Sequence, residues 1–154
     1  MVVEKRLFNM FSIIKKVGVF YNTYILGLEE KPNEVLCSLC VNQETIWNKR
    51  KYIPDYTDRK VLFISDFTTR YNHRNKGYAR YLLREIIKRF KDNYDLIHLN
   101  ACPYYIEDGY AVYKAPDNGL DMDSLIKFYE SFGFEIYGNT PEGFKAMILK
   151  KEVN

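Results

Sequence analysis

The feature of this sequence that most constrains its fold is an apolar run followed by a basic turn and an amphipathic segment. The run VLFISDFTT at 61–69 is rich in β-branched and aromatic residues, which is typical of a central strand. Residues 78–90 carry apolar side chains on one face and mostly charged side chains on the other, which predicts a helix. The apolar positions are Ala79, Leu82, Leu83, Ile86, Ile87 and Phe90. The sequence therefore predicts a strand, turn and helix unit over residues 61–90.

The first third of the chain is less clearly patterned. Residues 4–16 carry a helical stripe of apolar side chains, and residues 18–30 fit either a strand or a helix. A turn precedes a predicted strand at 34–42. The segment 43–60 is polar and basic, and Pro54 excludes a long helix there.

The rest of the chain continues the alternation of strands and helices. We expect a strand at 95–103, an irregular tyrosine-rich segment at 104–119, and a helix that Asp121 or Asp123 caps and Gly133 ends. FEIYG and FKAMILKK are predicted to close the chain as a hairpin. This order predicts a mixed α/β (α+β) sandwich whose sheet is parallel in the middle and antiparallel at the end.

Length and charge limit the class of protein. A chain of 154 residues is long enough for one domain with its own core. Its net charge of +3 permits an anionic ligand but is too small to indicate a nucleic-acid-binding protein. The apolar stretch at 7–21 is interrupted by Lys15 and Lys16, is too short to span a bilayer, and lacks a small-residue cleavage site. We therefore expect a cytoplasmic protein with no membrane partner.

The cysteines raise the alternative of a thiol or metal protein. Cys37 and Cys40 have the C-x-x-C spacing of some zinc and redox sites. In a strand, however, positions three apart point to opposite faces, and only Cys102, His73 and His98 remain as further ligands. We expect no metal site and interpret the cysteines as reduced thiols and the two histidines as structural.

The basic turn before the predicted helix at 78–90 is suited to an anion. The first amides of a helix lack intrahelical partners and lie at the positive end of its dipole, and Arg74 and Lys76 add charge. Pyrophosphate is the best geometric match. Gly77 lets the backbone approach a phosphate, and Ala79 keeps the first turn close to the strand. The P-loop and dinucleotide-binding patterns are both absent, and the plainer alternative is a basic loop with a glycine at the helix start.

Two motifs carry a resemblance to a known family. Residues 74–79, RNKGYA, match the pattern R/Q-x-x-G-x-G/A, and LIKFYESFGFE at 125–135 is similar to a helix with F/L-Y-x-x-x-G-F before a final hairpin. In this context the chain resembles the GNAT superfamily of acetyl-CoA-dependent N-acetyltransferases. The resemblance covers about residues 60–150, with Ala79 where the family often has glycine. The Lys-, Asn-, Ile- and Tyr-rich composition suggests a microbial or phage-like member.

The resemblance implies a domain organisation and a fold. One domain would span residues 1–154, with an N-terminal helix and strands at 1–59, an acetyl-CoA-binding core at 60–150 and a substrate-side insertion at 103–119. The implied fold is a central mixed, mostly antiparallel sheet with parallel, splayed central strands, flanked by helices.

The resemblance also implies a reaction, the transfer of acetyl from acetyl-CoA to an amine by direct attack in a ternary complex. No metal takes part. The turn and the strand end would both bind the cosubstrate, the turn through its amides on the pyrophosphate and the strand end through its backbone on the pantetheine arm and the thioester carbonyl. These residues are Phe67, Thr68, Thr69, Arg74, Asn75, Lys76, Gly77, Tyr78 and Ala79.

Tyr129 and Asp66 are the candidate catalytic residues. A phenol with a pKa near ~10 can protonate a departing thiolate whose pKa is near ~8.5, although Tyr129 also fits as one aromatic of a core stripe. The amine must be neutral to attack, which for a lysine-like amine at pH 7 costs about 4.6 kcal/mol. Asp66 is the candidate to accept that proton, to orient a water or to attract the cation. The alternative is a solvated strand aspartate.

The acceptor and the partners are less defined. Glu107 and Asp108, interleaved with tyrosines, would form a cation-attracting lid or a plain surface loop. The basic segment 45–60, with Trp47 able to stack bases, leaves open a nucleic-acid-directed module, for example one acting on aminoacyl-tRNA. A third alternative is a non-catalytic acetyl-CoA sensor. The acceptor amine belongs to a small molecule, a polyamine, a protein or a tRNA, and the sequence does not indicate whether the chain forms a homodimer.

Overall fold

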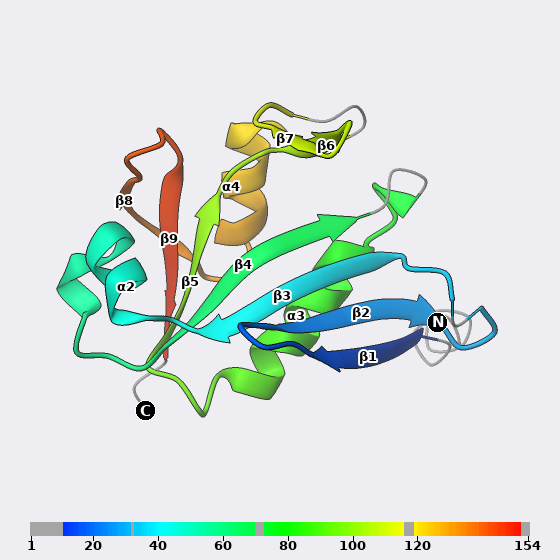
Figure 1. The fold of residues 1–154 in the computed structure, drawn as a ribbon, viewed down its shortest axis with the longest axis horizontal. Coiled ribbons are helices and arrows are strands. Elements are labelled where there is room, and N and C mark those ends of the chain that lie inside the picture. The colour runs from blue at the N-terminus through cyan, green and yellow to red at the C-terminus, as the bar shows by residue number, and fades with distance from the viewer. Residues whose placement is uncertain (1–10, 32, 70–72, 116–118, 152–154) are drawn as a thin grey trace.

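The computed structural model describes residues 11–31, 33–69, 73–115 and 119–151, and its main element is a seven-stranded sheet with the order β1-β2-β3-β4-β5-β9-β8 (Figure 1). β4 and β5 are parallel, and the other neighbours are antiparallel. The strands are β1 Phe11–Val17, β2 Asn22–Leu28, β3 Cys37–Gln43, β4 Val61–Thr69, β5 Leu96–Ala101, β8 Glu135–Asn139 and β9 Lys145–Lys150. The predicted class of a mixed sheet, parallel in the middle, is confirmed.

The helices cover both faces of the sheet. They are α2 Ile46–Tyr52, the 3-10 helix η1 Pro54–Tyr56, α3 Tyr78–Phe90 and α4 Met122–Glu130. α3 and α4 pack on the larger core, which includes Leu62, Ile64 and Leu99. The residues that alternate with these, such as Val61 and Leu96, belong to a second cluster with Ile53 at the end of α2. Within the described ranges, none of the helices combines the length and apolar character needed to cross a membrane.

The parallel pair β4 and β5 forms a fork. Pairing runs from Val61 with Leu96 to Ile64 with Leu99 and stops there, although β4 continues to Thr69. Figure 1 shows the two strands leaving a common point and diverging, with α4 seen between them. The splayed central strands of the expected fold are therefore present.

A β-bulge at Ser65 exchanges the faces of the sheet on which the following side chains of β4 lie. On β3, Val41 pairs with Ile64 but the preceding residue, Cys40, pairs with Asp66, so Ser65 is the extra residue. Regular alternation would place Asp66 on the core face with Ile64. The bulge instead places Asp66 on the opposite face and directs Phe67 toward the core.

The structure decides three of the expectations for the secondary-structure elements. Residues 11–16 are not helical but belong to β1, because all seven residues of 11–17 pair with β2 through a tight turn in which the Gly18 amide donates to Tyr21. The rest of the predicted helix, 4–10, lies outside the described residues. The ambiguous segment 18–30 contains strand β2. The segment 104–119 is not wholly irregular: β6 Tyr105–Glu107 and β7 Tyr110–Val112 form a hairpin whose Asp108-Gly109 turn has positive φ angles, a hairpin signal in the sequence.

Candidate functional site

A cavity of about 310 Å³ opens at the fork, between the end of β4, the start of α3, α4 and the segment after β5. Nine of the residues predicted to bind cosubstrate or act on it line this single cavity. These are Phe67, Thr68, Thr69, Arg74, Asn75, Gly77, Tyr78, Ala79 and Tyr129. Four other predicted residues do not line it: Lys76, Asp66, Glu107 and Asp108.

The start of α3 presents unpaired amides to the cavity. Gly77 is the N-cap residue, and among the described residues no side chain caps the helix there. The turn has two residues in the left-handed region, Gly77 with a φ of +82° and Asn75 with a φ of +62°, a conformation found in anion-binding turns. A Cβ on Gly77 would meet no atom of the described residues within 4 Å. Arg74 is anchored by a bond from Nε to the carbonyl of Thr69 at 3.2 Å, which joins the turn to the end of β4.

α4 delivers Tyr129 to the inner wall of the cavity. Asp121 caps this helix by accepting from the Ser124 amide at 2.8 Å, and Gly133, with a φ of +100°, ends it. Only 6% of Tyr129 is exposed, and its ring packs against Phe128 and Phe134. Burial raises the pKa of Tyr129 above its usual value, and the nearby thiols of two cysteines raise it further. The hydroxyl therefore stays protonated, as a proton donor requires.

The thiols around Tyr129 are protonated as well. Cys102 lines the cavity, and burial raises its pKa to about 11. Cys37 lies behind it in the core, where burial raises its pKa to about 12. Cys40 is on the other face of β3, paired with the hydroxyl of Thr23 at 3.4 Å. Among the described residues no group of three or more His, Cys, Asp or Glu side chains could hold a metal ion.

Asp66 lies across the sheet from the cavity, because the bulge at Ser65 turns it away. Asp66 is exposed to solvent, but the surrounding sheet partly desolvates its carboxylate. This desolvation raises the pKa of Asp66. A hydrogen bond from the Phe67 amide opposes that rise. Asp66 therefore lies on the face of the sheet opposite α3 and α4.

Glu107 and Asp108 are exposed in the β6–β7 hairpin, away from the cavity. Aromatic rings of the neighbouring segments lie closer to the cavity than these two carboxylates. Tyr113 lies 6.4 Å from Tyr104, which lines the cavity, and 5.6 Å from Phe144 of the β8–β9 turn.

Two further residues that sequence reasoning did not assign to the site also line the cavity. Arg80 lies 5.1 Å from the rings of Phe128 and Phe132, and its place in the first turn of α3 could have indicated it. His73, expected to be structural, lines the cavity and forms a 3.0 Å contact with Glu34.

The basic segment 45–60 lies on α2 and η1, apart from the cavity. Three of its basic side chains contact neighbouring groups of the protein. Lys49 is buried and donates to the carbonyl of Arg59 at 2.8 Å, and Lys51 lies 3.4 Å from Glu142. The guanidinium of Arg50 covers the exposed ring of Trp47 at 5.3 Å.

No family model matches the sequence, and a search of curated proteins finds no match. The fold is similar to an acetyltransferase of the GNAT family from Listeria monocytogenes, with a TM-score of 0.58 and 12% identity over 83% of this chain and 63% of that one. It is also similar to the ribosomal-protein-S18-alanine N-acetyltransferase of Escherichia coli, with a TM-score of 0.54 and 14% identity over 98% of this chain and 78% of that one. The chain has the GNAT fold.

A third similar structure is the NatC complex bound to Gag peptide and CoA, which matches the GNAT fold of this chain with a TM-score of 0.54 and 18% identity over 83% of this chain and 70% of that one. Identities this low show the fold alone. The chain spans less than two thirds of the Listeria protein's length.

Proposed function

We propose that the chain is an N-acetyltransferase that moves acetyl from acetyl-CoA to an amine by direct attack in a ternary complex. The observation that carries the proposal is the shared cavity, which is lined by the first residues of α3, by the diverging end of β4 and by Tyr129. A thioester linked to a diphosphate needs one of these groups for each of its parts. The amides suit the diphosphate, the strand backbone suits the connecting arm, and the tyrosine suits the leaving thiolate.

The cosubstrate would lie along the cavity from α3 toward the fork. The amides at 77–79 would hold the diphosphate, helped by Arg74 and, at the rim, by the exposed side chain of Lys76. The pantetheine arm would pair with the backbone of 67–69, which β5 leaves unpaired. One amide of this strand would also polarise the thioester carbonyl.

Tyr129 would protonate the thiolate that leaves. Its pKa is raised, which alone would make it a weaker acid. The departing thiol would be buried in the same cavity, where the pKa of Cys102 is raised to about 11, so the two pKa values stay close enough for proton transfer. The protonated state of Cys102 also favours direct attack over an acetyl-cysteine intermediate, because a thiol is a poor nucleophile.

The amine would approach from the face that carries Asp66. The raised pKa of Asp66 suits a group that takes a proton from the attacking amine, directly or through a water. The rings of Tyr104, which lines the cavity, and of Tyr113 and Phe144 beside it would favour a cationic amine, and the exposed Glu107 and Asp108 would add negative charge.

The test is a panel of amines, including polyamines, lysine peptides and aminoacyl-tRNA, with release of free CoA as the readout. We expect acetylation of at least one amine, and a fall in kcat of about 100-fold or more in Tyr129→Phe with unchanged affinity for acetyl-CoA. Tyr137→Phe is the matched control, because that hydroxyl bonds Asp55 outside the cavity. Binding of acetyl-CoA without any transfer would favour the sensor, and salt-dependent RNA binding without acetyl-CoA binding would favour the nucleic-acid module.

A further inference from the structure

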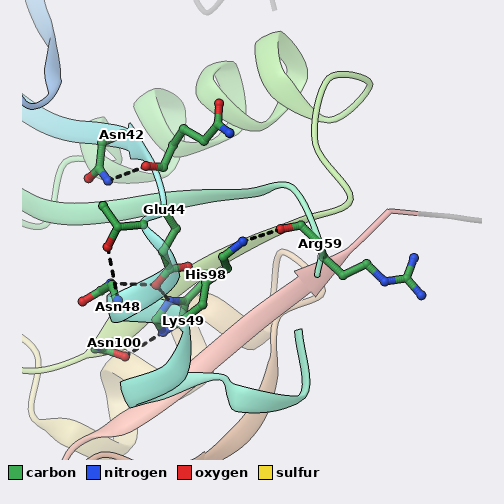
Figure 2. A network of polar contacts seen from close by, with 9 residues as sticks. Asn42, Glu44, Asn48, Lys49, Arg59, His98 and Asn100 are labelled. Carbon is green, nitrogen blue, oxygen red and sulfur yellow. Dashed lines mark hydrogen bonds and ion pairs between the residues drawn. The ribbon is translucent and has the colours of Figure 1, made fainter. Parts of the chain in front are cut away.

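A buried polar network joins α2 to the fork, and Figure 2 shows its members. Its centre is His98 of β5, which is fully buried. Nδ1 of His98 lies 2.7 Å from Oε1 of Glu44, and Nε2 lies 2.8 Å from Oδ1 of Asn100. Asn48 of α2 donates from Nδ2 to the same Glu44 oxygen at 2.6 Å. The network thus ends at Asn100, the first residue of β5 beyond its pairing with β4.

Packing does not account for this network. The His98 ring lies between Phe63, stacked at 5.0 Å, and Tyr52, at 5.9 Å. Among the described residues, Oε2 of Glu44 is buried without a hydrogen-bond partner. A buried, unsatisfied carboxylate oxygen destabilises a fold, and an apolar cluster of the same shape would avoid that penalty.

The hydrogen-bond geometry fixes the orientation of Asn100. Its Oδ1 is an acceptor only, so Nε2 of His98 must carry the hydrogen in their 2.8 Å contact. On the other side of the ring, Nδ1 lies 2.7 Å from Oε1 of Glu44. With Oδ1 bound, the amide nitrogen Nδ2 of Asn100 is turned away from His98, and within the described chain it has no hydrogen-bond acceptor.

Asn100 faces the side of the fork that an amine would enter. His98 and Asn100 alternate with the core residues Leu99 and Ala101, so both point to the face opposite the cavity. The bulge places Asp66 on the same face. The two side chains therefore stand on the two arms of the fork, Asp66 on β4 and Asn100 on β5.

We propose that Asn100 donates a hydrogen bond from Nδ2 to the oxyanion of the tetrahedral intermediate, with His98 and Glu44 as positioning residues. The inference rests on the proposed acetyl transfer. The amine nitrogen forms a bond to the thioester carbon, and the carbonyl electron pair moves to oxygen, where Asn100 meets it from the β5 side. Asp66 or a water takes the amine proton. The oxyanion then reforms the carbonyl as the C–S bond breaks, and the thiolate takes a proton from Tyr129.

The test compares Asn100→Asp with the wild type. Aspartate keeps the size of the side chain and the oxygen that faces His98 but replaces the donor Nδ2. We expect kcat to fall about 100-fold, with the KM of the amine and the affinity for acetyl-CoA unchanged. Asn42→Asp is the control, because Nδ2 of Asn42 only donates to the neighbouring carbonyl of Gln43, and it should keep full activity. An unchanged kcat, or a raised KM with unchanged kcat, would overturn the proposal.

Hydrolysis of acetyl-CoA by water passes through the same oxyanion and needs no amine. If the wild type acetylates no amine, the proposed function fails while the Asn100→Asp comparison is still made on hydrolysis. Absence of acetyl-CoA binding in calorimetry would overturn both.

The positioning role has its own readout. Nitrogen-15 spectroscopy should find a hydrogen on Nε2 of His98, and its absence would mean that Asn100 presents Nδ2 to the ring instead. His98→Phe should lower kcat without raising the KM of the amine, and combining it with Asn100→Asp should lower kcat no further. Additive losses in the double variant would contradict a role that acts through Asn100.

Discussion

Replacing Gly77 by glutamate should abolish acetyl-CoA binding without unfolding the protein. The φ of Gly77 is +82°, and no atom of the described residues lies within 4 Å of a Cβ built there, so the substitution brings backbone strain but no clash with this part of the chain. The strain of a non-glycine residue in this region is about 1–2 kcal/mol. The new carboxylate would stand in front of the α3 amides, where the diphosphate is proposed to bind, and would repel it.

Gly109 offers a matched control, because it has the same φ of +82°, is equally open, and lies in the β6–β7 turn away from the cavity. Both Gly77→Glu and Gly109→Glu should lower the melting temperature of the ligand-free protein by about 2–8 °C, since 1 kcal/mol corresponds to about 2–4 °C at this size.

The ligand separates the two variants. Acetyl-CoA at a hundredfold excess over Kd stabilises a protein by about 2.7 kcal/mol. That corresponds to a rise of about 5–11 °C in a thermal-unfolding scan. The wild type and Gly109→Glu should show the rise, and Gly77→Glu should not. A full rise in Gly77→Glu would refute the assignment of the α3 amides to the diphosphate.

Two further predictions follow from pKa values. The pKa of Asp66 is raised in the fold, so the folded state holds the carboxyl proton more tightly than the unfolded chain does. The ionised Asp66 carboxylate therefore lowers the stability of the fold once the pH exceeds the unfolded pKa of 3.8. Asp66→Asn should therefore raise the melting temperature at pH 7, lose that advantage below about pH 4, and lower acetylation; equal stability at both pH values would contradict the shift. Because the pKa of Cys102 is raised to about 11, iodoacetamide at pH 7.5 should modify it slowly, as followed by mass spectrometry. Acetyl-CoA should slow that reaction further while leaving Cys40, outside the cavity, unaffected; equal protection of both thiols would mean that the ligand acts elsewhere.

Local patterns were enough to predict the core unit of the fold. β4 and α3 begin and end at the predicted residues, because β-branched composition and a 3.6-residue period each depend only on neighbours in sequence. The N-terminal segment shows where this fails. Phe11 and Ile13 both pack against the core, and that spacing fits a strand as well as part of a helical stripe. The pairing of residues 11–17 with β2 makes this segment a strand.

Local sequence patterns predicted the strand, basic turn and helix unit, and with it eight of the residues that line the cavity, because a helix start and the strand before it are adjacent in the chain. Only the tertiary structure decided on which face of the sheet Asp66 stands, since that depends on one extra residue in the pairing with β3. It alone brought Glu44 to His98 across 54 positions of sequence. Contacts at such a separation are set by strand order and register, and no local periodicity encodes them.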